Sequence, residues 1–393
     1  MTDKNRRKDT LLAHLGRHPR EHHGAVNPPV YHASTITFPT VAALEQSRVN
    51  RFGGTHYGRY GTPTTFAFEE AVAALEGGYR AMVLPSGLAA VAGALLACTK
   101  AGDHVLMVDS AYGPARNTCN SILTRHGVET TYYDPLIGAG ISALIRPNTK
   151  VVYVESPGSL TFEVQDVPAI AKAAHAAGAL VLMDNTWATP YFFAAFAHGV
   201  DVSIHAATKY LVGHSDAMLG VLVTTEACYQ PVRTMVAGLG YTAGPDDVYL
   251  GLRGLRTLSV RLQRHQENAL QVAKWLQSRP EVAAVLYPAL PSDPGHALWR
   301  RDFTGASGLF GAILKPTPKA AVDAMLDGLE LFGMGASWGG FESLILPTDP
   351  AKLRTARPWA AAGPTLRLHI GLEDPADLID DLTTGFERLN RQR

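Results

Sequence analysis

The segment Leu180-Val-Leu-Met-Asp-Asn-Thr186 contains an unbroken apolar run that ends on an acid. Such a run predicts a buried strand over residues 180–183, because the strands of a parallel sheet are covered on both faces. Similar runs at residues 81–84, 104–108 and 151–154 predict further strands of the same kind. Asp184 therefore stands at the end of a buried strand, where open α/β sheets bind their ligands.

Helical patterns alternate with these strands along the chain. Before residue 180, Asp166 can cap a helix, Pro168 fits its first turn and Gly178 follows its end. This alternation predicts an α/β domain with a doubly wound, mainly parallel sheet over residues 59–250. Residues 1–58 show no sustained period, and we interpret them as an N-terminal arm.

The pattern changes near residue 249. A long amphipathic stretch over residues 248–278 stops before Pro280 and predicts a single helix that bridges two domains. Strand-like runs at 309–314 and 365–370 follow, with one helix near residues 320–329 and another behind Asp374. We therefore expect a small α+β domain over residues 251–393 that starts with a long helix.

The composition excludes several classes of protein. The 393 residues include 35 Lys plus Arg and 35 Asp plus Glu, with no basic run interleaved with aromatics, so we expect no nucleic-acid partner. No signal-peptide pattern and no long apolar stretch occurs, so we expect no membrane partner. The three cysteines are widely spaced and match neither a disulfide framework nor a zinc pattern, which favours a reducing cytoplasm.

A histidine-rich segment near the start of the chain is the one pattern that suggests a metal. Its members are His14, His18, His22 and His23. No carboxylate or cysteine completes a ligand shell there, so a solvated terminus is the better interpretation and we predict no metal site.

Lys209 indicates which kind of ligand Asp184 could bind. It lies in Ser203-Ile-His-Ala-Ala-Thr-Lys-Tyr210, 25 residues after Asp184, which is enough chain for one crossover to the next strand. A lysine among small neighbours can form a Schiff base with an aldehyde cofactor, and burial lowers its pKa so that it can act as a base. A buried Asp184 needs a cationic partner, and a protonated pyridine nitrogen is one. A surface lysine and a structural ion pair are the alternatives.

Several other residues are candidates for binding a cofactor or substrate, but each is a weak indication when taken alone. The turn Ser86-Gly87-Leu88 between a strand and a helix can bind phosphate through backbone N–H groups. Tyr112 can stack on an aromatic ring, and Tyr57-Gly-Arg59 supplies a phenol and a guanidinium. Arg367 alternates with apolar residues in a strand-like segment, where an inward arginine requires a carboxylate.

Taken together, these motifs resemble a known family, the pyridoxal-phosphate (PLP) enzymes of Cys/Met metabolism, and within it the cystathionine β-lyases. The resemblance runs from about residue 26 to 389. The motifs that carry it are Tyr57-x-Arg59-Tyr60-x-x-Pro63-Thr64, Ser86-Gly87, Glu155-Ser-Pro, Asp184-Asn-Thr186, Ala207-Thr-Lys-Tyr-x-x-Gly-His-Ser215 and Ser337-Trp-Gly-Gly-Phe-Glu-Ser-Leu344.

The resemblance implies a fold, an assembly and residue roles. The fold would be PLP fold type I, the aspartate-aminotransferase-like architecture, in a homotetramer built as a dimer of dimers. The implied catalytic residues are Lys209, Tyr57 and Tyr112. The implied cofactor-binding residues are Gly87, Leu88, Tyr112, Asp184, Thr208 and Lys209 from one subunit, with Tyr57 and Arg59 from its neighbour. The implied substrate-binding residues are Arg367, Ser337, Trp338 and Ser159.

The implied reaction is cleavage of the amino acid L-cystathionine to homocysteine, pyruvate and ammonia in methionine biosynthesis. Pro114 stands where similar methionine γ-lyases would have a cysteine, which favours β-elimination. Ala336 replaces a tyrosine of the β-lyase pattern, so an S-alkylcysteine lyase, a cysteine desulfhydrase and a γ-synthase or γ-lyase stay open. A non-catalytic scaffold is the alternative from another class, and retention of Lys209, Asp184 and Arg367 argues against it.

Overall fold

The large domain is built on a seven-stranded sheet. The computed structural model describes residues 6–49 and 51–392. The strands are β1 (Arg80–Leu84), β2 (His104–Val108), β3 (Glu129–Tyr133), β4 (Thr149–Glu155), β5 (Leu180–Asp184), β6 (Val202–His205) and β7 (Gly220–Thr224). Their order is β1-β7-β6-β5-β4-β2-β3, and β7 alone runs in the direction opposite to the other six strands. The predicted mainly parallel sheet is confirmed.

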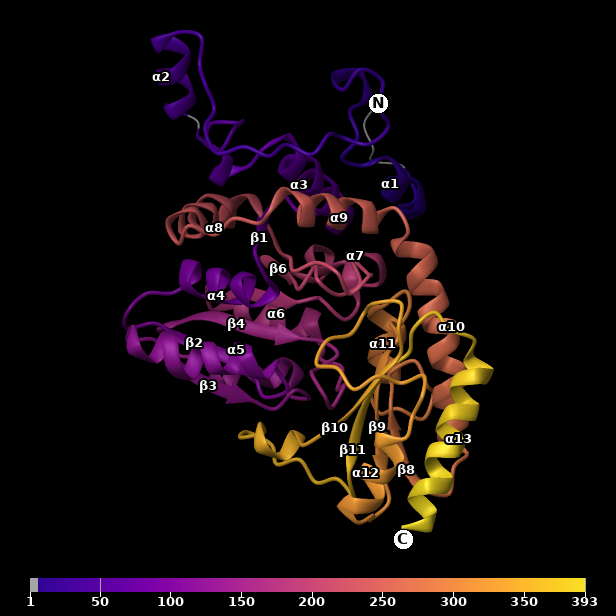
Figure 1. The fold of residues 1–393 in the computed structure, drawn as a ribbon. Helices are drawn as coiled ribbons and strands as arrows, with labels where there is room; N and C mark the ends of the chain where they lie inside the picture. Colours follow the sequence, from indigo (N-terminus) through magenta and orange to yellow (C-terminus); the bar gives the residue numbers. More distant parts are fainter. Residues whose placement is uncertain (1–5, 50, 393) are drawn as a thin grey trace.

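Burial on both faces explains why the central strands could be recognised. Every residue of β2 is buried, and so are Val151 to Val154 of β4. Helix α6 (Val167–Ala176) begins as predicted, because the Asp166 carboxylate accepts a hydrogen bond of 3.2 Å from the N–H of Ala169. Helices α3 (Pro63–Glu76) and α4 (Gly87–Cys98) also pack on the sheet (Figure 1).

The expectation of one helix over residues 248–278 is wrong. Two helices occupy this stretch, α9 (Pro245–Leu255) and α10 (Leu258–Gln277), and Figure 1 shows the chain turning between them. At the turn, the Arg261 guanidinium donates to the carbonyl of Gly254 (2.8 Å) and to the Thr257 hydroxyl (3.0 Å). The Gly254 carbonyl, which a continuous helix would bond to the N–H four residues later, thus accepts from this side chain and from the N–H of Thr257 (3.1 Å), and helical periodicity cannot reveal such contacts.

The small domain is a four-stranded antiparallel sheet with two covering helices. Its strand order is β10-β11-β9-β8, from β8 (Val282–Leu286), β9 (Leu309–Leu314), β10 (Leu344–Thr348) and β11 (Thr365–His369). Helices α12 (Lys319–Asp327) and α13 (Pro375–Arg391) contact each other, and α13 also lies along α10 (Figure 1). Asp374 caps α13 as predicted.

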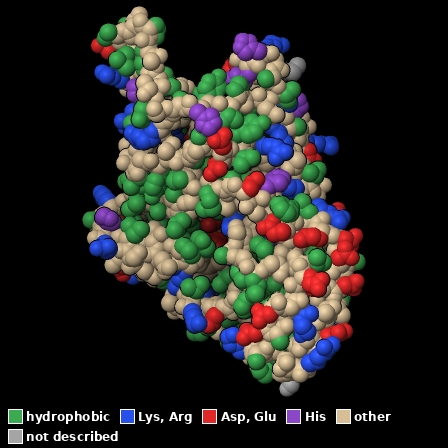
Figure 2. Space-filling model, viewed as in Figure 1, with side chains coloured by type: hydrophobic (Ala, Val, Ile, Leu, Met, Phe, Trp, Pro, Cys, Tyr) green, Lys and Arg blue, Asp and Glu red, His purple; other side chains and the backbone are tan. Residues whose placement is uncertain are grey.

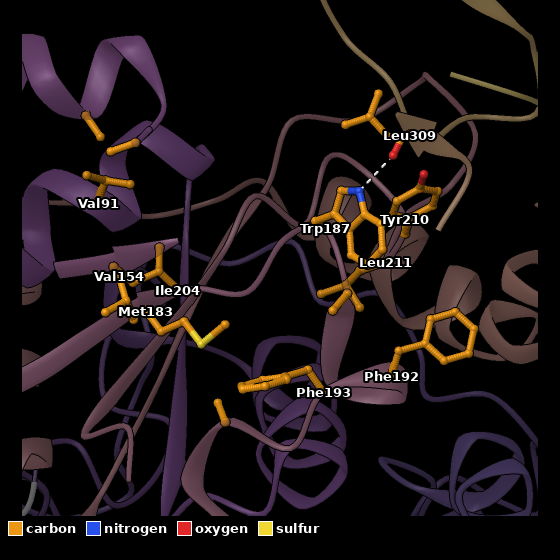
Figure 3. Close-up of a cluster of buried hydrophobic side chains, with 14 of the residues drawn as sticks. Val91, Val154, Met183, Trp187, Phe192, Phe193, Ile204, Tyr210, Leu211 and Leu309 are labelled. Carbon is orange, nitrogen blue, oxygen red and sulfur yellow. Dashed lines mark hydrogen bonds between the residues drawn. The ribbon is translucent and has the colours of Figure 1, made fainter. Parts of the chain in front are cut away.

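The two sheets meet through a buried tryptophan. Trp187 follows β5, and its indole N–H donates to the carbonyl of Leu309, the first residue of β9, at 2.8 Å (Figure 3). Trp187 is 5% exposed and belongs to the core cluster that Figure 3 draws. The ends of β5 and β9 are thereby held together. The predicted residue boundaries at 58/59 and 250/251 stay a prediction.

The N-terminal arm has one docked part and one projecting part. Helix α1 (Lys8–His14) is anchored by the Lys8 ammonium, which donates to the carbonyls of Pro190 and Tyr191 at 2.7 and 2.8 Å. Helix α2 (Val41–Val49) has no buried residue and stands away from the body (Figures 1 and 2). Among the described residues, no helix is long and apolar enough to cross a membrane.

Candidate active site

A cavity of about 490 Å³ lies where β4 and β5 end, between the large domain and loops of the small domain. The face drawn in Figure 2 is hollowed near its middle, with hydrophobic side chains gathered around the hollow. The predicted residues that line the cavity are Gly87, Leu88, Tyr112, Ser159, Asp184, Thr208, Lys209, Ser337, Trp338 and Arg367. The fold therefore brings candidates from both domains into one site.

Lys209 reaches into this cavity from the turn that follows β6. Its ammonium lies 2.6 Å from the Ser337 hydroxyl and 5.4 Å from the ring centre of Trp338. Burial lowers the pKa of Lys209 to about 8, and the nearby Arg367 charge acts in the same direction. A substantial fraction of this amine is therefore neutral near physiological pH, as a nucleophile or a base requires.

Asp184 ends β5 with one carboxylate oxygen already satisfied. Its Oδ1 accepts hydrogen bonds from the N–H (3.0 Å) and the hydroxyl (2.5 Å) of Thr186. Burial raises the pKa of this carboxyl, while the Thr186 hydrogen bonds and the nearby His205 and Lys209 act against that effect. Within residues 6–49 and 51–392, Oδ2 has no hydrogen-bond partner, so it can accept a proton-bearing group of a ligand.

Glu155 is a site residue that the sequence-based prediction missed. It ends β4 beside Asp184, since the two residues are paired in register. Its carboxylate accepts hydrogen bonds from the Tyr112 N–H (2.7 Å) and the Ser159 hydroxyl (2.6 Å). Burial raises the pKa of Glu155 to about 8, and the neighbouring Asp184 adds to the shift. Its place in the Glu155-Ser-Pro motif, at the end of a predicted strand, is the signal that could have identified it.

The N-terminus of α4 forms one wall of the cavity. Ser86 caps this helix by accepting a hydrogen bond of 3.1 Å from the N–H of Ala89. A Cβ atom on Gly87 would lie 2.5 Å from the Cβ of Ala206, so only glycine lets the helix end approach the lysine turn this closely. The Thr208 hydroxyl stands on the same wall and bonds to the backbone of Leu219. Helix N–H groups with a nearby hydroxyl suit a phosphate.

Arg367 faces the cavity from β11. Its Nη2 atom donates to the carbonyls of Gly335 (3.1 Å), Ala336 (3.3 Å) and Ser337 (3.1 Å). No partner for Nε or Nη1 occurs among the described residues, so that part of the guanidinium can bind a carboxylate. Tyr112 lies on the same cavity, where burial raises the pKa of its phenol and keeps it protonated.

Tyr57 and Arg59 do not reach this cavity within their own chain. They line a separate hollow of about 470 Å³ beside the start of α9. The Arg59 guanidinium donates to the Ala237 carbonyl (2.5 Å) and to the Tyr60 hydroxyl (2.9 Å). Their predicted roles in a neighbouring subunit's site stay a prediction.

The residues around the cavity fit PLP. The lysine amine can hold its aldehyde carbon, and the free oxygen of Asp184 can pair with its ring nitrogen. The Gly87 turn leaves room for a phosphate, and Tyr112 offers a ring face.

Comparisons with known proteins agree with this arrangement. The sequence profile of the Cys/Met metabolism PLP-dependent enzymes matches residues 9–387. The chain is 47% identical to the cystathionine β-lyase of Escherichia coli, with 99% of this chain and all of the relative covered. It is 46% identical to the cystathionine β-lyase of Salmonella typhimurium at the same coverage. The crystal structure of metB from Corynebacterium glutamicum superposes with a TM-score of 0.90 at 32% identity, covering 99% of this chain and 100% of that one. The chain belongs to the family of Cys/Met metabolism PLP-dependent enzymes and has PLP fold type I.

Proposed function

We propose that this chain is a PLP-dependent carbon–sulfur lyase that cleaves L-cystathionine to homocysteine, pyruvate and ammonia. The observation that carries the proposal is the meeting of Lys209, Asp184 and Arg367 on one cavity. The identity of 46–47% to two cystathionine β-lyases over their full length supports the choice of substrate. Such a reaction belongs to methionine biosynthesis. A cytoplasmic location is supported by the three cysteines, all of which are free thiols.

Different residues of the chain bind the substrate and remove its proton. When bound, PLP supplies an electron sink conjugated to the substrate Cα. Arg367 binds the α-carboxylate through the guanidinium atoms that face the cavity. This contact places the Cα–H near Lys209, whose lowered pKa lets its amine remove that proton. The Cβ–S bond then breaks, homocysteine leaves as the thiol, and water completes the release of pyruvate and ammonia.

The substrate side chain lies toward Trp338 and Ala336. Both residues line the cavity. They belong to the loop whose carbonyls at residues 335–337 accept hydrogen bonds from Arg367. An alanine at 336 leaves apolar space where a larger polar residue could bond the distal end of a long substrate. A missing hydrogen bond of that kind is worth about 0.5–1.5 kcal/mol, so short S-alkylcysteines should compete with cystathionine.

We expect purified enzyme to release pyruvate from cystathionine, because elimination from Cβ leaves a three-carbon keto acid. The measurement is identification of the keto acid formed from cystathionine, cysteine, S-methylcysteine and methionine. A main product of 2-oxobutyrate from cystathionine or methionine would instead show a γ-lyase. Keto-acid release from cysteine and S-methylcysteine but not from cystathionine would show a desulfhydrase or an alkylcysteine lyase.

A homotetramer with shared active sites is part of the proposal. The projecting arm exposes apolar side chains that a single chain leaves uncovered, with Val41 71% and Val49 82% exposed. Tyr57 and Arg59 follow this segment and line a hollow away from their own chain's cavity. An arm of this kind can bring both side chains to the phosphate end of a neighbouring subunit's site.

Two inactive variants should therefore restore activity when combined. Arg59→Ala and Lys209→Ala chains, co-expressed with different tags, should regain part of the wild-type turnover. Each mixed interface would contain one site that lacks both defects and one that has both. The measurement is keto-acid release by the doubly purified mixed oligomer, with each variant alone as the control. An inactive mixed oligomer would mean that Arg59 acts within its own chain.

A further inference from the structure

A loop of the small domain is anchored to the large domain through one buried carboxylate. The loop comprises residues 353–357, between the short helix Pro350–Lys352 and β11. Its anchor is Asp109, directly after β2, whose side chain is fully buried. The hydrogen bonds that Asp109 accepts from the loop come from the N–H groups of Thr355 (2.9 and 3.0 Å), Ala356 (2.9 Å) and Arg357 (3.1 Å), the Thr355 hydroxyl (2.9 Å) and the Arg354 Nε (3.2 Å).

The charges in this contact are balanced. The Arg116 guanidinium also donates to Asp109 at 3.0 Å and lies over the ring of Tyr132. Arg354, with 3% of its side chain exposed, also donates to Glu163 at 2.8 Å. Burial alone would raise the pKa of Asp109, but the N–H groups of the loop hold it below its usual value. Two cations and two anions thus face one another at the domain boundary.

Arg354 connects Asp109 to a second loop of the cavity wall, which comprises residues 156–163. Besides Glu163, it donates to the Thr161 hydroxyl at 3.1 Å. This loop also carries Ser159, and its Leu160 and Phe162 have φ values of +65° and +57°. Side chains other than glycine rarely adopt this left-handed region, so external contacts must hold the loop in this shape.

The loop of residues 353–357 also contacts the turn that carries Tyr112. Methyl groups of Leu353 lie 3.8 Å from the position that a Cβ on Gly113 would occupy. Asp109 precedes Tyr112 by three residues, and the loop continues through residues 358–364 into β11, which carries Arg367. One contact region therefore links Tyr112, Ser159 and Arg367, which lie on three different segments.

We propose that Asp109, Arg354 and Glu163 form an interdomain clamp that sets the distance between the carboxylate-binding Arg367 and the Tyr112 and Ser159 walls of the cavity. They are positioning residues, because none of them lines the cavity. The inference rests on the proposed function only for the role of Arg367. It adds to that function a contact that holds the small domain against the large domain around the bound substrate.

Weakening the clamp should reduce affinity more than turnover. If the clamped arrangement falls to about a tenth of the population, the apparent affinity falls about tenfold, while the bound complex still reacts normally. Arg354→Lys keeps the charge but loses the planar fork that reaches both carboxylates. Thr355→Ala is a milder second variant, since it removes a methyl group and the hydroxyl that bonds Asp109 and Arg116 but keeps the backbone N–H that bonds Asp109.

The control is Arg357→Gln in the same loop. The Arg357 guanidinium is half exposed and lies 3.4 Å from Asp134, whereas the N–H that binds Asp109 belongs to its backbone. This variant should therefore keep the clamp. All measurements use the PLP-loaded enzyme, and the unchanged Lys209 and Asp184 should leave the absorbance of the bound cofactor as in the wild type.

The test has two readouts. We expect Arg354→Lys to raise KM for cystathionine about tenfold, with kcat within about twofold of the wild type. Thr355→Ala should raise KM as well, and Arg357→Gln should change neither constant. Titration with L-alanine, followed by cofactor absorbance, should show the same loss of affinity, and amide hydrogen exchange should rise at residues 109–113 and 156–163. A normal KM and alanine affinity in both clamp variants would overturn the clamp, even with a lower Tm. Weaker alanine binding in a protein that makes no pyruvate would retain the clamp and refute the β-lyase proposal.

Discussion

Replacing Lys209 with alanine should abolish covalent attachment of PLP and lower turnover by about 10³-fold or more. The variant loses the amine that holds the cofactor and the base that removes the Cα proton, and general base catalysis alone contributes roughly 10²–10⁴-fold. The amine lies on the same cavity as Asp184, and its pKa is lowered to about 8 by burial. The measurements are keto-acid release and the absorbance of the purified protein.

Reduction with borohydride tests the assignment directly. In the wild type it should fix a pyridoxyl label on the peptide that contains Lys209, and the alanine variant should carry no label. Lys150→Ala, which removes an exposed lysine at the start of β4, is the matched control and should be labelled and active as the wild type. A label on any other lysine would refute the role of Lys209.

Four of the seven strands of the large sheet, β1, β2, β4 and β5, could be predicted because unbroken apolar runs mark them; β6 and β7 are also buried but were not predicted. The apolar run at residues 104–108 predicts β2 at its observed bounds, and every residue of this strand is buried. Strand β3, by contrast, is Glu-Thr-Thr-Tyr-Tyr at the sheet edge, where only Tyr133 is fully buried, and no apolar run marks it. The break between α9 and α10 depends on Arg261 reaching back to Gly254, a contact that amphipathic spacing does not encode.

The candidate site shows a similar limit. Asp184 could be proposed because it follows a recognisable apolar run, and Lys209 because it stands 25 residues later among small neighbours. Glu155 occupies an equivalent place, yet its importance depends on hydrogen bonds from Tyr112 and Ser159 that only the folded loops provide. The partners of Asp109 in the small domain lie about 245 residues further along the chain, so nothing local to Asp109 indicates a role in the domain contact.

Replacing Arg367 with leucine should have the second largest effect, mainly through KM. Leaving a carboxylate without its hydrogen-bonded cation costs about 2–5 kcal/mol, which corresponds to a roughly 30- to 4000-fold lower kcat/KM. The loss should include some kcat, because Arg367 also donates to the carbonyl of Ser337, whose hydroxyl lies 2.6 Å from the Lys209 amine. The measurements are kcat and KM for cystathionine and the affinity for L-alanine.

Arg367→Lys separates the charge from the geometry of the guanidinium. An ammonium keeps the positive charge but cannot reach both a substrate carboxylate and the carbonyls of Gly335 and Ala336, so this variant should lie between the wild type and the leucine variant. Cofactor absorbance and borohydride labelling should stay normal in both variants, because Lys209 and Asp184 are intact. An unchanged KM and alanine affinity in Arg367→Leu would show that the α-carboxylate binds elsewhere. Ser337 alone would then be the remaining candidate on this side of the cavity.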